Sequence, residues 1–250
     1  MEYPIQATRP VYDLGRWFEQ AWNVFKAHIW EFILLAIVLA LPALVIGGAV
    51  GGFSAIDAIQ HPQQPSSPFP LAPSRMTVIL TVVAAIFGAV VSTPLAVGAA
   101  AVSLNVVRTS VFDWDRLWTG FRKWPDSFVI GLIVGALMLP PSMFPLLWIL
   151  FPLWIAISLW GLFAYYTLSE PGTDYRSAIN RGILLIKGNF WWAVLFAFVS
   201  GFVSVLGLVA CCVGVFFTIA FYQVLIATAY NDLTRQTAPA PSPSDGEVAP

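Results

Sequence analysis

The sequence predicts an all-α fold: a polytopic membrane helical bundle with six transmembrane helices and three cytoplasmic interfacial amphipathic helices. Hydrophobic residues make up 58% of the 250 residues and charged residues only 10%, whereas soluble domains carry about 25% charged residues. Four long stretches contain no Asp, Glu, Lys or Arg. Finally, a six-span arrangement places nearly all basic residues on one side of the membrane. Together these observations favour a protein for which the bilayer is the solvent.

The four uncharged stretches cover residues 32–56, 76–107, 127–169 and 188–231. A helix needs about 20 apolar residues to cross a hydrocarbon core of about 30 Å, so the first two stretches hold one span each. The third would form a helix of about 65 Å. It is interrupted by Pro140, Pro141 and Pro145, and Gly207 and Gly214 flank a turn in the fourth. The spans are expected at about 30–52, 78–104, 127–141, 146–168, 190–209 and 213–231.

Basic residues set the expected orientation. With the N-terminus inside, eleven of the twelve Lys and Arg residues lie in cytoplasmic segments, and Arg75 alone lies outside. Cytoplasmic segments are enriched in Lys and Arg, so both termini are predicted to be cytoplasmic, in a bacterial inner membrane. The first apolar run begins only near Phe32, behind several charges, so we expect a retained first span rather than a cleaved signal peptide.

The chain is expected to form one integral-membrane domain over residues 1–233. Its external loop, residues 53–75, contains five prolines with Gln and Ser between them. Such a segment favours extended backbone, either as a flexible connector or as a docking site for an external partner, and the connector is the simpler interpretation. Residues 234–250 have almost no apolar bulk and are predicted to be a disordered cytoplasmic tail.

An internal repeat divides the domain into units of about 11–107, 111–169 and 173–232. Apolar residues recur at helical spacing from Leu14 to Phe25, and adding 161 to each position reproduces the pattern. The matched pairs include Asp13 and Asp174, Lys26 and Lys187, and Trp30 and Trp191. A shorter match follows Asp113. Each Asp is placed to cap its helix. A common amphipathic rule would also produce this pattern. A true repeat predicts one bent-helix shape for residues 13–40 and 174–201, with the bend near Ala27 and Gly188.

Most tryptophans fall in or beside these three cytoplasmic segments, where indole suits the headgroup region. The residues predicted at the membrane interface are Trp17, Trp22, Lys26, Trp30, Trp114, Trp118, Lys187 and Trp191. Small residues four apart let helices approach closely. Helix packing is therefore predicted at Gly47, Gly51, Gly131 and Gly135. The uncharged polar residues of the spans are expected to pack helices together as well. The alternative is that they line a narrow polar path for a substrate.

Chemistry-bearing residues are sparse. His28 and His61 are expected on opposite sides of the membrane, so they cannot share a site. Glu31 is the one ionisable residue in an expected span. It favours an interfacial position near Lys26 and His28 over a proton-sensing role. The adjacent Cys211 and Cys212 are expected to be buried and reduced. We therefore expect no enzyme activity, no metal, no cofactor and no nucleic-acid partner.

Four segments resemble a known family. They are AWNVFKAHIWEF at 21–32, FDWDRLWTGF at 112–121, SAINRGILLIKGNFW at 177–191 and CCVGVFFTIAFYQVLIATAYNDL at 211–233. They are similar to the membrane domain of some bacterial glycerophosphodiester phosphodiesterases and of its stand-alone relatives, over most of the chain outside the proline-rich loop and the tail. The proline that such relatives often carry near Ala220 is absent. The phosphodiesterase domain is missing too, so the resemblance implies an architecture and no hydrolase residues.

Two functions are compatible with these features. The first is a non-enzymatic membrane protein: a scaffold, a lipid-organising protein or a partner subunit. The second is a transport or permease component whose cytoplasmic helices dock a soluble energy-coupling partner. Membrane lipids are expected partners in either case. The sequence leaves open whether a protein partner or a second copy of the chain also binds.

Overall fold

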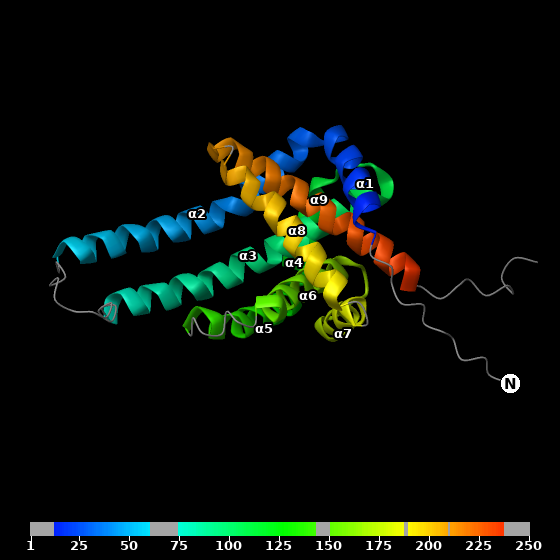
Figure 1. Cartoon of the computed structure of the whole chain (residues 1–250). Helices are drawn as coiled ribbons and strands as arrows, with labels where there is room; N and C mark the ends of the chain where they lie inside the picture. The colour runs from blue at the N-terminus through cyan, green and yellow to red at the C-terminus, as the bar shows by residue number, and fades with distance from the viewer. Residues whose placement is uncertain (1–12, 61–74, 144–150, 188–189, 210, 238–250) are drawn as a thin grey trace, which may run out of the picture.

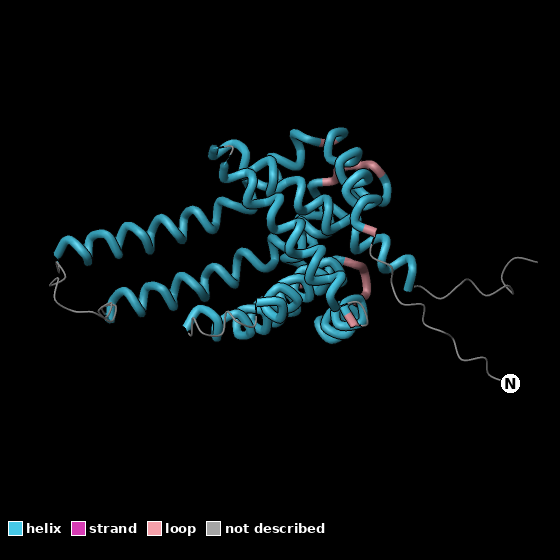
Figure 2. The backbone as a smooth tube through the Cα atoms, in the orientation of Figure 1, coloured by secondary structure: helices cyan, strands magenta, loops and turns pink. Residues whose placement is uncertain are grey.

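The computed structural model describes residues 13–60, 75–143, 151–187, 190–209 and 211–237. Within these ranges the chain forms nine α-helices and one short 3₁₀ helix, and no strand (Figure 2). The all-α prediction is therefore confirmed for the described part of the chain.

The N-terminal pair of helices is sharply bent. Helix α1 (Leu14–Ala27) starts at Asp13, whose side chain accepts a hydrogen bond from the backbone N–H of Arg16. This is the N-cap that the sequence predicts. The long helix α2 (Ile29–Gln60) follows after His28, and its first part makes an angle of 94° with α1.

The next segment returns along α2 as α3 (Arg75–Thr109). A short connection then forms the 3₁₀ helix η1 (Trp114–Trp118) and α4 (Thr119–Arg122), before α5 (Trp124–Met143). Asp113 caps η1 by accepting a hydrogen bond from the backbone N–H of Asp115. The middle amphipathic segment is thus one turn of 3₁₀ helix followed by one turn of α-helix, shorter than the two others.

The C-terminal half repeats the bent arrangement. Helix α6 (Phe151–Ser169) leads through Gly172, at φ +74°, into α7 (Tyr175–Ile186). The carboxylate of Asp174 caps α7 through the backbone N–H of Ser177. Helix α8 (Phe190–Val209) leaves at 98° to α7, and α9 (Cys211–Thr237) completes the fold.

Helices α3 and α9 form the centre of the molecule. Helix α3 contacts α2, α5, α6 and α9, while α9 contacts α1, α2, α3 and α8. Figure 1 shows α2 and α3 side by side, extending beyond the other helices, and α9 packs next to α8. The core combines large buried residues from distant segments, including Trp17, Phe32, Phe163, Phe196 and Tyr230.

Several helices are long and apolar enough to cross a membrane. Among the described residues, the stretches Val90–Thr109, Pro152–Ser169 and Gly214–Gln236 meet this condition on their own. The two bent pairs, α1 with the start of α2 and α7 with the start of α8, bring the number to as many as five. These lengths and compositions are those of a membrane protein.

Two expected linkers are shorter than the sequence predicts. Helix α2 continues to Gln60 and α3 begins at Arg75, so the expected loop at 53–75 is helical at both ends. Helix α9 continues to Thr237, into the expected tail. Both helices end two residues before a proline, Pro62 or Pro239. A residue that precedes proline disfavours helical backbone, so proline sets these boundaries more closely than polarity does. Residues 61–74 and 238–250 lie outside the described ranges.

Candidate functional site

Charged residues meet where α3, α6, α7 and α9 come together. The carboxylate of Glu170, just after α6, accepts hydrogen bonds from Arg108 at 2.7 Å and from Arg181 at 2.5 Å. Arg108 also donates to the side-chain oxygen of Asn231 over 3.0 Å. One carboxylate thus bridges two guanidinium groups, from α3 and α7, and offsets one of their two positive charges. We refer to Arg108, Glu170, Arg181 and Asn231 as the polar junction.

Lys123 hydrogen-bonds to the C-terminal end of α6, beside the polar junction. Its ammonium donates to the backbone carbonyls of Leu168 at 2.8 Å, Glu170 at 2.6 Å and Thr173 at 3.1 Å. Burial lowers the pKa of Lys123, and the charges of Asp126 and Glu170 oppose that shift. The last carbonyls of a helix lack hydrogen-bond donors within the helix. At the end of α6 the ammonium of Lys123 is such a donor.

A second charged contact fixes α1 to α9. Oδ2 of Asp232 accepts hydrogen bonds from the Nε1 of Trp17 at 2.8 Å and from Arg16 at 2.5 Å. The ring of Trp17 is completely buried and packs edge-to-face on Phe196, with centroids 5.2 Å apart. The polar junction and the Asp232 contact are each held by hydrogen bonds within the protein, and each joins separate helices.

Trp17 therefore has a different place from the one the sequence predicts. Its ring lies in the protein core and cannot reach lipid headgroups. Ala21 and Phe25 on the same face of α1 are also fully buried, and Phe25 packs edge-to-face on Phe217 with centroids 4.8 Å apart. The apolar face of α1 is covered by α9, because an amphipathic stripe packs as well on a neighbouring helix as on lipid.

The other tryptophans predicted at the interface face outward. Trp30 and Trp191 are 74% and 71% exposed. Trp22, Trp114 and Trp118 also count among the exposed large hydrophobic residues. Trp30 and Trp191 stand just after the respective bends, at positions that the predicted repeat would match. Large exposed indoles are what a membrane-facing surface requires.

The two lysines predicted at the interface differ in their surroundings. The ammonium of Lys26 lies over the ring of Trp22, 5.8 Å from its centroid, in a cation–π contact. Lys187, at the C-terminal end of α7, instead borders an apolar groove.

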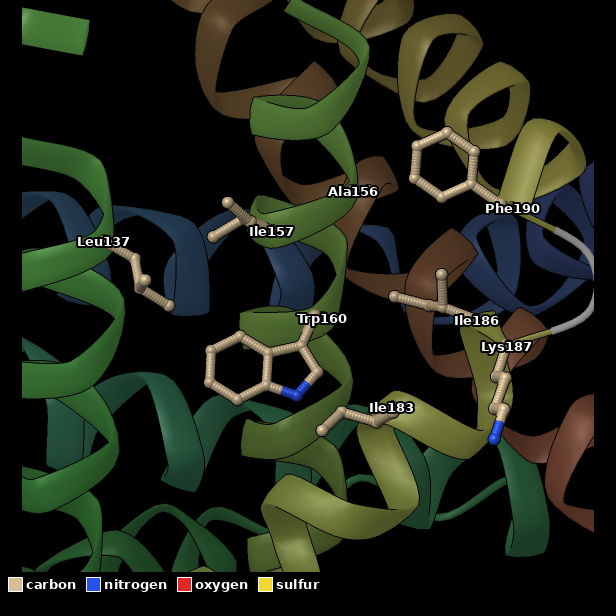
Figure 3. Close-up of a pocket in the computed structure, with 8 residues that line it drawn as sticks. All are labelled: Leu137, Ala156, Ile157, Trp160, Ile183, Ile186, Lys187 and Phe190. Carbon is tan, nitrogen blue, oxygen red and sulfur yellow. The ribbon is translucent and has the colours of Figure 1, made fainter. Parts of the chain in front are cut away.

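This groove has a volume of about 540 Å³ and lies between α5, α6, α7 and the start of α8. Figure 3 shows the ring of Trp160 between Leu137 and Ile183, and Phe190 at the far side from Leu137. The indole Nε1 of Trp160 donates to the carbonyl of Ile179 over 3.3 Å, which orients the ring. Among the described residues that line the groove, Lys187 is the only charged one.

The predicted packing glycines have unequal surroundings. A Cβ added to Gly131 would lie 2.4 Å from Oγ1 of Thr93, whereas one added to Gly135 would meet nothing within 4 Å. Gly47 and Gly51 lie in α2, and their surroundings are outside the described part of the structure. Two glycines outside the predicted set approach backbone directly. A Cβ at Gly98 would lie 1.9 Å from the carbonyl oxygen of Leu117, and one at Gly120 would lie 1.8 Å from that of Pro94.

Among the described residues, His28 lies beside Glu31 at the bend between α1 and α2. Nδ1 of His28 is buried and lies 3.8 Å from Glu31, too far for a hydrogen bond. His61 is outside these ranges. No group of three or more His, Cys, Asp or Glu side chains among the described residues lies close enough to hold a metal ion.

Sequence reasoning also missed Lys123, Glu170 and Asp232. A signal was present for Glu170 and Asp232, because each directly follows an uncharged stretch, whereas Asp126 separates Lys123 from the nearest one. Comparison with protein-family models, with curated protein sequences and with solved structures found no match for this chain.

Proposed function

We propose that this chain is a non-enzymatic protein of the bacterial inner membrane that crosses the bilayer six times and organises lipid at its cytoplasmic surface. The observation that carries the proposal is the matched position of Trp30 and Trp191. Each follows a bend of more than 90° between an amphipathic helix and an apolar one, and each ring points away from the protein. Indole rings at such a step rest among lipid headgroups, where they anchor the helices.

The threefold repeat gains support from the burial pattern of α1 and α7. Trp17 and Ala178, Ala21 and Gly182, and Phe25 and Ile186 are buried in both units of the repeat. The capping carboxylates Asp13 and Asp174 accept from the N–H three residues later in both. A shared amphipathic rule explains the buried faces, whereas the matching caps, bends and exposed tryptophans favour a true repeat.

Six spans are supported by the lengths of six helices. Helices α2, α3, α5, α6, α8 and α9 each overlap one of the spans expected from the sequence. The shortest of them, α6, has 19 residues, close to the roughly 20 residues that cross a hydrocarbon core. In this arrangement the polar junction, α1 and α7 lie at the cytoplasmic surface.

Depth measurements by electron paramagnetic resonance test the interfacial position. Cys211 and Cys212 are first replaced by Ala, and single cysteines are then introduced as W30C or W191C and spin-labelled in lipid nanodiscs. Both labels should show accessibility typical of the headgroup region. The matched control N180C, on the exposed face of α7, should be accessible to water-soluble relaxers. Water-like accessibility at all three positions would contradict the proposal.

The topology requires its own experiment. On the same cysteine-free background, S66C and S244C are labelled in intact cells with an impermeant maleimide. S66C should react from outside, and S244C only after the membrane is opened. Equal reaction of both from one side would exclude six spans with cytoplasmic termini.

Lipid organisation is measured with spin-labelled phospholipids. The purified protein in vesicles should immobilise a fraction of the lipid, and the W30A/W191A variant should immobilise clearly less. A W17F variant provides the control, because Trp17 is buried. If W30A/W191A leaves the immobilised fraction unchanged, the tryptophans do not hold lipid.

A further inference from the structure

The groove between α5, α6, α7 and α8 has the size of a ligand site. Its volume of about 540 Å³ falls within the range of about 300–1,000 Å³ that small-molecule sites occupy. Seven of its eight lining residues are uncharged and mostly large and apolar. Such a lining suits a hydrocarbon chain and offers nothing to a polar solute.

One positive charge stands at the border of this groove. The ammonium of Lys187 has no ion-pair or hydrogen-bond partner among the described residues, unlike the guanidinium groups of Arg108 and Arg181. Helix α7 ends at Ile186 and α8 begins at Phe190. The negative end of one helix dipole and the positive end of the other therefore adjoin and largely offset each other. The net charge at this end of the groove is that of Lys187.

The matching place in the first unit is filled. Trp22 takes the position of Ile183 there, and its ring packs on Phe221 with centroids 5.8 Å apart. Lys26, which matches Lys187, lies over Trp22. The indole of Trp22 thus fills a space in the first unit. The smaller side chain of Ile183 leaves the corresponding space open in the third unit. Among the described residues, the open groove with an available cation lies at the third unit, and Trp22 stands at the matching place of the first.

We infer that the groove binds one anionic phospholipid, with an acyl chain against Trp160, Ile183 and Phe190 and the phosphate at Lys187. This inference rests on the proposed position of the protein in the membrane. A long lysine stem lies along apolar surface while its charge reaches the headgroups, so Lys187 matches a phosphate at that depth. An anionic lipid satisfies both the apolar lining and the cation, whereas in a zwitterionic lipid the choline cation offsets the attraction of its phosphate to Lys187.

Native mass spectrometry of the full chain in detergent tests the inference. Dioleoyl phosphatidylglycerol and dioleoyl phosphatidylcholine are added at equal concentration, and the dissociation constant of the first bound lipid is measured for each. The wild type should prefer phosphatidylglycerol about fivefold, as expected for one cation near a lipid surface. K187Q should abolish that preference, and the matched variant K26Q should retain it. Equal loss in K187Q and K26Q, or no preference in the wild type, would overturn the inference.

A second pair of variants tests the groove itself. I183W places an indole in the groove, while L184W places one on the neighbouring exposed position of α7, outside the lining. I183W should weaken the first lipid site several-fold, and L184W should leave it unchanged. If both variants bind lipid as the wild type does, the chain does not lie in the groove. The depth measurements at Trp30 and Trp191 are independent of these results, so failure here would leave the membrane position standing.

Discussion

The indole Nε1 of Trp17 donates a hydrogen bond to Oδ2 of Asp232 over 2.8 Å, joining the first amphipathic helix to the last helix of the fold. The two residues are 215 positions apart in the chain. Asp232 also accepts from Arg16 and, at 3.0 Å, from Gln236. The carboxylate of Asp232 therefore links α1, near the start of the described chain, to α9, the last helix.

This contact predicts a measurable cost for W17F, which keeps an aromatic ring but removes the N–H donor. A hydrogen bond to a charged acceptor contributes about 1.5–3 kcal/mol, so W17F should lower the free energy of unfolding by roughly that amount. Thermal unfolding in detergent provides the measurement. The control W30F alters a ring that is 74% exposed and should change stability by less than about 0.5 kcal/mol. Equal effects of W17F and W30F would show that the bond to Asp232 contributes little.

Gly98 and Gly120 should be intolerant of even one added methyl group. In both cases the added Cβ would collide with a backbone carbonyl, of Leu117 or Pro94, which cannot rotate away. Overpacking of this kind costs about 1–3 kcal/mol, and more where the clash is with backbone, so G98A and G120A should detach η1 and α4 from α3.

The matched control is G135A, where a Cβ meets nothing within 4 Å. Replacing a glycine inside a helix by alanine stabilises by roughly 0.5–1 kcal/mol when space allows. G135A should therefore unfold at the same temperature as the wild type or slightly higher. Normal expression and stability of G98A would mean that the connection between α3 and α5 does not pack as the structure has it.

Lys123 should be more important for stability than its neighbour Arg122. K123M keeps the aliphatic stem but removes the donor that serves three backbone carbonyls, those of Leu168 in the last turn of α6 and of Glu170 and Thr173 after it. Leaving such partners without a donor costs about 1–3 kcal/mol. R122M removes an exposed cation and should cost less than about 0.5 kcal/mol. Chemical denaturation of both variants in the same detergent compares them directly, and a cost for R122M equal to that for K123M would contradict this role.

The sequence determined helix existence well because lipid thickness and apolar length are directly linked. The expected span at 190–209 coincides with α8. The burial of Trp17 inside the protein could not be predicted from apolar length. The apolar stripe of α1 has the same period whether a bilayer or another helix covers it, and only the distant Phe196 and Asp232 decide between the two.

The glycines show the same limit. Spacing of small residues along one helix drew attention to Gly131 and Gly135, which differ in their neighbours. Gly98 and Gly120 approach carbonyls of separate segments, and no pattern within one helix encodes such an approach. The groove at Lys187 likewise depends on four segments together, so its charge was visible in the sequence but its cavity was not.

The cap of α7 predicts a pH dependence that is confined to acid. Hydrogen bonds from the side chain and the backbone N–H of Ser177 lower the pKa of Asp174 below its ordinary value of 3.8. The ionised cap therefore stabilises α7 fully above pH 3.8, and this contribution is lost as the pH falls through the lowered pKa. D174A should speed amide hydrogen exchange in the first turn of α7 about fivefold at neutral pH. The difference from the wild type should shrink below pH 3.8, because protonation then weakens the wild-type cap as well.

Amides in the first turn of α1, capped by Asp13, serve as the internal control and should exchange alike in both proteins. A difference that stays constant from about pH 7 down to about pH 2 would show that the charge of Asp174 does not stabilise α7.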